Sequence, residues 1–170
     1  MKRILASALS AALLMGALAG CGGNTGSGSV SGSNASAGGS SSGENVIKIG
    51  VFEPATGDSA SGGKKEMLGM QYANSLTPTV EVGGTEYTVE LVYADNGSST
   101  DKAPTAASQL VSEGVSLVLG SYGSGVSIAA GPTFGSAGIP AIGVTCTNPN
   151  VTAGNDYYFR ICFLDPFQGT

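Results

Sequence analysis

Glycine and serine residues that could bind an anion gather in the stretch GSYGSGVS, residues 120–127. A glycine-rich turn that opens a helix directs backbone N–H groups toward an anion, and the Ser124 hydroxyl could add a further donor. Gly123 and Gly125 would let a ligand approach the main chain closely, because they carry no Cβ atom. The anion held by such a turn could be a phosphate, a reacting oxyanion, or a carboxylate that is bound and released.

The spacing of these residues argues against the first two anions. The three glycines match neither the dinucleotide-binding fingerprint nor the phosphate-binding loop, since no Lys-Ser or Lys-Thr pair follows them. Gly123-Ser124-Gly125 is similar to the nucleophile turn of serine hydrolases, but Tyr122 stands where that turn has a glycine. The chain has no histidine that could activate Ser124. A bound carboxylate is therefore favoured, and an exported hydrolase is the weaker alternative.

A second polar turn, Thr145-Cys146-Thr147-Asn148-Pro149, offers hydroxyl and carbonyl oxygens. These oxygens could accept hydrogen bonds from an ammonium group, so the two turns together suit a small zwitterion such as an amino acid. The alternative is that Thr147 and Asn148 only cap a turn before Pro149, as such residues commonly do. Tyr122 could either line the site or pack beneath the loop.

Alternating strand and helix patterns must place these two turns. Hydrophobic periodicity predicts, in chain order, a strand at 46–52, a helix at 64–76, a hairpin of 80–82 with 85–94, a helix at 101–113 and a strand at 115–119. After the stretch 120–127 it predicts a helix that ends at about 136, and then two strands at 139–144 and 157–163. This order is typical of a doubly wound α/β fold with a mostly parallel sheet. Ligands of such sheets bind beyond the carboxyl ends of the strands, which here means the loops 53–63, 94–99, 120–125 and 145–149.

Composition excludes several classes of function. The net charge is −5 and no basic cluster occurs after the first residues, so binding to nucleic acid is not expected. The absence of histidine removes the commonest zinc ligand, and neither a metal nor a cofactor is expected. Cys146 and Cys162 could form a disulfide in an oxidising compartment, but buried free thiols are the commoner arrangement.

The N-terminus predicts export. Residues 1–20 combine a basic start with an apolar run from Ile4 to Ala19, which is shorter than the about 20 residues of a membrane-spanning helix. Leu18-Ala19-Gly20-Cys21 resembles the lipobox of bacterial lipoproteins, and this resemblance implies a lipid on Cys21 and anchoring to the outer face of the cell membrane. Residues 22–43 are mostly glycine and serine and predict a flexible tether.

The far end of the chain predicts the start of another element. Asp165-Pro166 is a helix-initiating pair, yet only four residues follow it. Residues 44–164 are therefore expected to form one lobe, and residues 165–170 the start of a crossover to a missing second lobe.

Several motifs occur in the order seen in the leucine/isoleucine/valine-binding family, the type I periplasmic substrate-binding proteins of ABC importers. Besides the lipobox, they are the strand 47–51 with Thr56-Gly57-Asp58, then 120–124, 147–149, 158–160 and 168–169. The resemblance implies two doubly wound lobes that close on an amino acid and deliver it to an ABC permease. It implies no reaction. A receptor lipoprotein that uses the same fold for sensing is the alternative.

The resemblance also implies roles for individual residues. Ser124, with Gly123 beside it, matches the serine that binds the ligand carboxylate. Thr145 matches the residue whose carbonyl accepts from the ligand ammonium, and Thr147 matches its hydroxyl partner. Gly62 stands where leucine-binding members have an aromatic ring against the ligand side chain, so the specificity of this chain need not be for leucine. The disulfide of some members is absent, because glycines 97 and 123 occupy its positions.

Overall fold

The computed structural model describes residues 45–168, and the predicted signal peptide 1–20, Cys21 and the tether 22–43 lie outside the described residues. Eleven elements follow one another in this part of the chain: β1 (Val46–Glu53), α1 (Ala60–Leu76), β2 (Thr79–Val82), β3 (Thr85–Asp95), α2 (Ala103–Ser112), β4 (Leu117–Leu119), α3 (Ser124–Ala137), β5 (Ala141–Gly143), a short 3-10 helix η1 (Pro149–Val151), β6 (Tyr158–Arg160) and α4 (Asp165–Gln168). Within residues 45–168 no helix combines the length and apolarity that crossing a membrane requires.

The six strands form one sheet in the order β2-β3-β1-β4-β5-β6. Only the β2–β3 hairpin is antiparallel, and all other neighbours pair in parallel. The chain therefore winds from β1 outward to β3 and then crosses back over β1 to β4, β5 and β6. This confirms the predicted doubly wound, mostly parallel α/β fold. The point where the winding reverses lies between β1 and β4.

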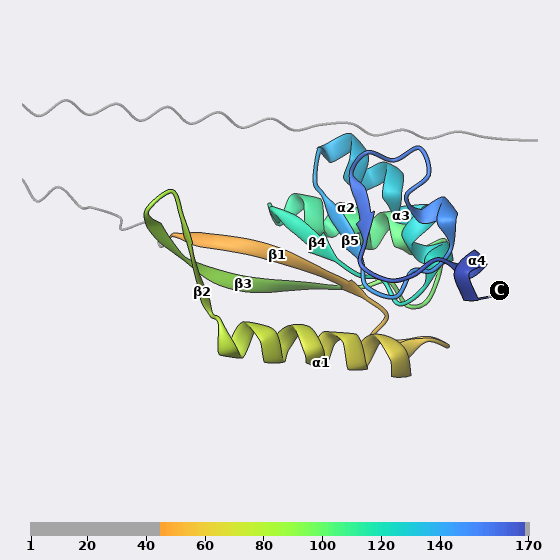
Figure 1. Cartoon of the computed structure of the whole chain (residues 1–170), viewed down its shortest axis with the longest axis horizontal. Helices are drawn as coiled ribbons and strands as arrows, with labels where there is room; N and C mark the ends of the chain where they lie inside the picture. The colour runs from red at the N-terminus through yellow and green to blue at the C-terminus, as the bar shows by residue number, and fades with distance from the viewer. Residues whose placement is uncertain (1–44, 169–170) are drawn as a thin grey trace, which may run out of the picture. The chain divides into compact units, whose positions relative to one another are not determined.

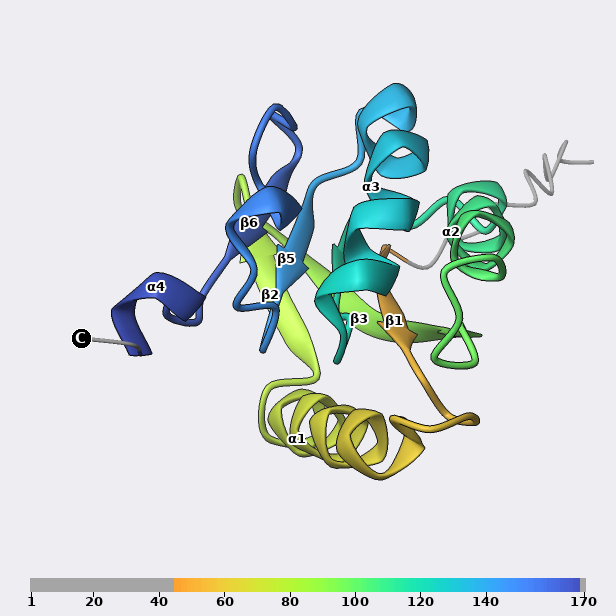
Figure 2. The same ribbon diagram turned by 90° about the vertical axis from the view of Figure 1, so that its right-hand side faces the viewer.

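Helices cover the two faces of the sheet unequally (Figures 1 and 2). Helices α2 and α3 lie side by side on one face, and α1 lies alone on the other. Side chains of β1 alternate between these faces, as a strand requires. Phe52 packs edge-on against Phe134 of α3, with ring centroids 5.5 Å apart, whereas Ile49 and Glu53 point to the α1 side.

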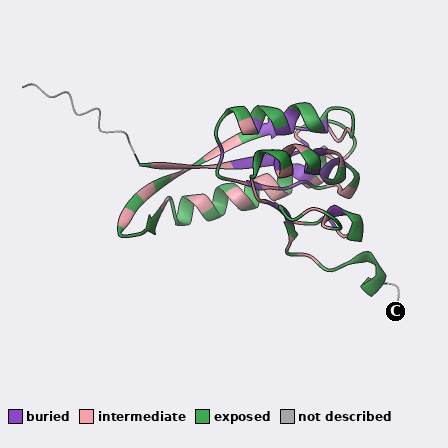
Figure 3. Ribbon diagram, turned by 90° about the horizontal axis from the view of Figure 1, so that it is seen from above, coloured by how far each residue is buried: buried purple, intermediate pink, exposed green. Residues whose placement is uncertain are grey.

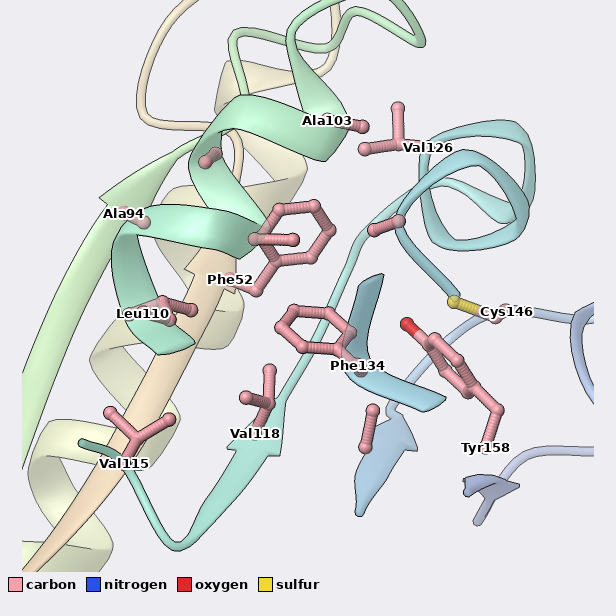
Figure 4. Close-up of a cluster of buried hydrophobic side chains, with 14 of the residues drawn as sticks. Phe52, Ala94, Ala103, Leu110, Val115, Val118, Val126, Phe134, Cys146 and Tyr158 are labelled. Carbon is pink, nitrogen blue, oxygen red and sulfur yellow. The ribbon is translucent and has the colours of Figure 1, made fainter. Parts of the chain in front are cut away.

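The hydrophobic core lies between the sheet and the α2–α3 pair (Figure 4). Its largest side chains, Phe52, Phe134 and Leu110, are fully buried. Helix α2 contributes the buried side chains Ala103, Ala107 and Leu110 to it, and Val111 is only partly buried. Figure 3 shows the contrast with α1, which is largely exposed and in which Gly63 alone is buried. The α2–α3 side of the sheet therefore provides most of the packing.

Several predicted boundaries differ from the structure. Helix α1 begins at Ala60 and not at residue 64, because Gly62 and Gly63 can be helical where a larger residue would collide with Tyr122 or Pro54. The last two strands are shorter than predicted, at three residues each. Helix α3 ends at Gly138, whose φ of 67° is the left-handed conformation that glycine adopts readily.

Candidate functional site

The carboxyl ends of β1, β4 and β5 meet at one edge of the sheet, beside the point where the winding reverses. Each of these strands is followed by one of the loops that the sequence singled out. The position of Gly120 just after β4 requires glycine, because its φ is 115° and a Cβ atom there would collide with the Phe52 carbonyl and the Glu53 carboxyl. The turn 120–123 is thus pressed against the end of β1.

A buried polar network fixes the turn in place. The Ser121 side chain accepts a hydrogen bond from Asn96 Nδ2 at 3.0 Å, and the Ser121 carbonyl accepts one from the Cys146 thiol at 2.8 Å. The Tyr158 hydroxyl donates to the Gly120 carbonyl at 2.9 Å, and Ser127 Oγ lies 3.0 Å from the Cys146 sulfur. These side chains serve the backbone geometry of the turn and do not face a ligand.

Cys146 is unsuited to nucleophilic chemistry in this network. Burial raises the pKa of its thiol to about 11, and hydrogen bonding with the Ser127 side chain and the Ser121 backbone only partly opposes this rise. Cys146 and Cys162 are both free thiols in the structure, Cys146 buried and Cys162 half-buried. No group of three or more His, Cys, Asp or Glu side chains suited to a metal ion occurs within residues 45–168.

Ser124 is the first residue of α3 and follows the N-cap Gly123, whose backbone is extended. Its Oγ accepts a hydrogen bond from the Asn148 backbone N–H at 3.2 Å, which leaves the hydroxyl proton available as a donor. The backbone N–H groups of the first turn of a helix have no intrahelical partner and can bind an anion. The bond to Asn148 brings the turn 145–149 against this helix start, so the two predicted turns are neighbours.

The oxygens of the turn 145–149 differ in availability. The Cys146 carbonyl accepts from Arg160 Nη1 at 2.8 Å, and the Thr147 carbonyl accepts from the Asp165 N–H at 2.9 Å. Within residues 45–168 neither the Thr145 carbonyl nor the Thr147 hydroxyl forms a hydrogen bond, so these two oxygens can accept from a ligand. The Asn148 side chain accepts from the Asn150 N–H at 2.9 Å and caps η1, which confirms the alternative role for that residue.

A hollow of about 430 Å³ opens beside these turns. Gly62, Tyr122 and Thr145 all line it, and the Tyr122 ring lies directly against Gly62. A Cβ atom on Gly62 would collide with the Tyr122 ring, so the ring fills the room that Gly62 leaves. The remaining lining residues are polar: Asp58, Ser59, Ser61, Lys65 and Glu66.

The predicted site residues thus fall into two adjoining groups. Gly62 and Thr145 share the hollow, whereas Gly123, Ser124 and Thr147 lie at the start of α3 and the turn that contacts it. The sequence left open whether Tyr122 lines the site or packs beneath the loop, and it assigned no site role to Glu66; both line the hollow. The signal for Tyr122 was an aromatic residue in a turn of small residues, but its facing partner Gly62 lies 60 positions away in the chain.

A carboxylate joins two of the loops at the same edge. Asp95, the last residue of β3, accepts hydrogen bonds from the Thr56 hydroxyl at 2.6 Å and from the backbone N–H groups of Ala55 and Gly97 at 2.8 Å. Partial burial would raise the pKa of this carboxyl, but the hydrogen bonds outweigh burial and lower it. The loops after β1 and β3 are therefore held together by a charged acceptor.

A family model described as "Periplasmic binding protein" matches residues 46–168. The "Leu/Ile/Val-binding protein homolog 2" of Brucella abortus (strain 2308) is 31% identical over 124 residues, which are 72% of this chain and 33% of that protein. The chain thus spans about a third of the length of the curated relatives it matches.

Solved structures agree with this match. The leucine-binding protein LivK of Thermotoga maritima is 37% identical with a TM-score of 0.68, over 73% of this chain and 35% of that one. LivJ of Streptococcus pneumoniae, solved with isoleucine, is 32% identical with a TM-score of 0.63, over 71% and 34%. A solute-binding protein of Rhodopseudomonas palustris, solved with 4-hydroxybenzoate, is 26% identical with a TM-score of 0.62, over 70% and 32%.

Proposed function

The chain belongs to the periplasmic binding protein family, and from that premise we propose that it forms one wall of the ligand cleft of an extracytoplasmic solute-binding protein. The ligand is an amino acid or a similar small zwitterion, which is captured unchanged and passed to an ABC permease. Binding energy drives the closure of two lobes over the ligand, and the permease recognises the closed form.

The observation that supports this proposal best is the pairing of free donors and free acceptors at one edge of the sheet. The start of α3 with the Ser124 hydroxyl suits the carboxylate of the ligand. The Thr145 carbonyl and the Thr147 hydroxyl suit its ammonium group. The hollow that Gly62, Tyr122 and Thr145 line would then receive the side chain of the ligand.

The ligand screen that tests this function uses the complete protein and the twenty common amino acids, with 4-hydroxybenzoate as an aromatic acid that lacks an ammonium group. Isothermal titration calorimetry should find a tightly bound amino acid that is recovered chemically unchanged. Binding of 4-hydroxybenzoate in preference to every amino acid would overturn the zwitterion assignment, and a transformed ligand would overturn the absence of reaction.

The same titration locates the ammonium site. Replacing Thr147 by alanine should cost about 1.5–3 kcal/mol of affinity if its hydroxyl meets a charged ammonium group. Thr105→Ala on the exposed face of α2 is the matched control and should bind as tightly as the parent protein. Equal affinities of the Thr147 and Thr105 variants would remove Thr147 from the site.

We further propose that a lipid on Cys21 anchors the protein to the outer face of the bacterial cell membrane, with residues 22–43 as the tether. Cys21→Ser should shift the protein from the membrane fraction to the soluble exported fraction. Retention of the variant on the membrane would contradict the anchor, while ligand binding would be unaffected in either case.

A further inference from the structure

Glu53, the last residue of β1, is a carboxyl group buried directly behind the hollow and is only 1% exposed. Its Oε2 accepts a hydrogen bond from the Tyr122 backbone N–H at 2.8 Å. Its Oε1 is buried and has no donor among the described residues. A buried carboxylate oxygen without a donor is costly, because it has lost its water and gained nothing in return.

Glu66 of α1 presents a matching oxygen. Its Oε1 accepts from the Thr145 hydroxyl at 2.6 Å, while its Oε2 is buried and, within residues 45–168, also without a donor. The two carboxyl groups lie within hydrogen-bonding reach of each other. One proton between them satisfies both unpartnered oxygens, because protonated Glu53 can donate through Oε1 to Glu66 Oε2.

The surroundings favour this single shared proton. Burial raises the pKa of Glu53 to about 9, with smaller contributions from the hydrogen bond to Glu66 and from the negative charge of Glu66. The hydrogen bond from the Tyr122 N–H opposes this rise. Burial, and to a smaller degree the charge of Glu53, raises the pKa of both Cys146 and Tyr158, so both are neutral where Glu53 titrates. Lys65 and Asp58 line the hollow beside Glu66 and are the charged groups on its open side.

We propose that Glu53 and Glu66 are positioning residues of the cleft, which hold Tyr122 and Thr145 in place by sharing one proton. Three consecutive hydrogen bonds then run from the Tyr122 N–H to Glu53, from Glu53 to Glu66, and from the Thr145 hydroxyl to Glu66. They join the end of β1, helix α1 and the loops after β4 and β5. This proposal rests on the proposed function, since Tyr122 and Thr145 matter to a ligand only if the hollow receives one. Loss of the proton would leave two facing carboxylates and push α1 away from the turn that carries Tyr122.

A nuclear magnetic resonance titration of the ligand-free chain tests the pair by itself. The carboxyl carbon of Glu53 should remain in its protonated form at neutral pH and titrate near the pKa of about 9. The amide proton of Tyr122 should shift in the same pH range, since it bonds to the titrating group. Titration of Glu53 in the ordinary range of glutamate would overturn the proposal.

Two variants separate hydrogen bonding from simple structural support. In Glu53→Gln the new side-chain amide donates to Glu66 and accepts from the Tyr122 N–H. The chemical shift of the Tyr122 amide proton should therefore persist at neutral pH, and its change at alkaline pH should vanish. In Glu66→Gln the new amide supplies the donor, so the titration of Glu53 should move to lower pH. If Glu66→Gln leaves the titration of Glu53 unchanged, the shared proton is refuted. This result does not depend on whether Glu53→Gln folds.

Ligand affinity in the complete protein tests the positioning role. With the amino acid that binds most tightly, each protein is compared with its own affinity at neutral pH, because the ligand ammonium also loses its proton at alkaline pH in both. As pH rises through the titration of Glu53, affinity should fall about three- to tenfold further in the parent than in Glu53→Gln, the range expected for one lost hydrogen bond. An equal alkaline loss in both proteins would refute the positioning role. If no amino acid binds but the carboxyl titration is found, the proposed function fails and the shared proton stands.

Discussion

At the scale of single residues, two glycines of the cleft have opposite surroundings. Gly62 faces the Tyr122 ring so closely that a methyl group has no room, whereas a Cβ on Gly123 would meet only Val126, at 3.8 Å. The backbone of Gly123 is also extended, with φ −171°, which any residue can adopt. Packing therefore explains why glycine occupies position 62 but does not explain it at position 123, where the proposed close approach of a ligand would require it.

Alanine at these two positions should therefore act differently. Gly62→Ala should displace the Tyr122 ring and lower the free energy of unfolding by about 1–3 kcal/mol, as overpacking does. Gly123→Ala should leave stability within about 0.5 kcal/mol of the parent chain and yet weaken ligand binding in the complete protein. Urea unfolding and calorimetry measure the two effects. Unchanged ligand affinity in Gly123→Ala would show that the ligand does not approach the main chain there.

The raised pKa of Glu53 also predicts how stability depends on pH. Between the ordinary pKa of 4.5 and the raised value of about 9, the folded chain keeps a proton that the unfolded chain has lost. The stability that the Glu53 proton contributes is fully present below pH 4.5 and is lost as pH rises toward the raised pKa of about 9. The free energy of unfolding falls by up to about 1.4 kcal/mol per pH unit in this range. Urea unfolding at several pH values should show this decline in the parent chain but not in Glu53→Gln. Parallel pH profiles of the two chains would contradict it.

At the scale of elements, the loops of the cleft depend on bonds to one another more than on their own propensities. The loop after β1 contains no regular structure until Ala60, and Asp95 at the end of β3 holds it through Ala55 and Thr56. Ser98 adds a second connection, because its hydroxyl donates to the Thr56 carbonyl at 3.0 Å and accepts from the Ser59 N–H at 2.9 Å. The start of α1, and with it Gly62, is thus positioned from β3.

Asp95→Asn should loosen this connection, because an amide is a weaker acceptor than a carboxylate and cannot satisfy the same set of donors. We expect a loss of about 1 kcal/mol in the free energy of unfolding at neutral pH, measured with urea. Since hydrogen bonds lower the pKa of Asp95, its contribution is present above the ordinary pKa of aspartate and is lost as pH falls through the lowered value. The difference in free energy of unfolding between the parent and Asp95→Asn should therefore shrink in acid. A difference that stays constant with pH would show that the charged Asp95 carboxylate is not its cause.

At the scale of the whole described lobe, the two faces of the sheet are covered to different degrees. On the α1 side an apolar groove of about 600 Å³ runs over Ile49, Leu91 and Leu119, and Ile161 at its border is 74% exposed. The opposite face is buried under α2 and α3 (Figure 2). Exposed apolar area of this kind is unusual for an isolated soluble domain.

The folded chain should therefore bind an apolar fluorescent dye on the α1 side before it unfolds. Ile161→Ser should reduce the dye fluorescence with little change in the urea midpoint, because the side chain already lies in solvent. Ile128→Ser on α3, 39% exposed, is the control on the other face and should leave the signal unchanged. A dye signal that appears only in the unfolding transition would contradict an accessible groove.

The sequence by itself determined the type and order of most elements. Alternating patterns, the Gly83-Gly84 turn and Pro104 at the start of α2 specify local conformation, which depends on neighbours a few positions away. The mostly parallel sheet followed from that order, since strands separated by helices pair in parallel. The nearness of Ser124 to the turn 145–149 followed as well, because the carboxyl ends of parallel strands meet at one edge.

Only the tertiary structure decided which side chains face one another across that edge. Tyr122 fills the room left by Gly62, and Glu53 meets Glu66, although no local pattern relates the members of either pair. The bounds of the short strands and the early start of α1 were also decided by packing. Such contacts depend on the distance and angle between elements distant in the chain, and these are fixed only when the sheet and its helices pack together.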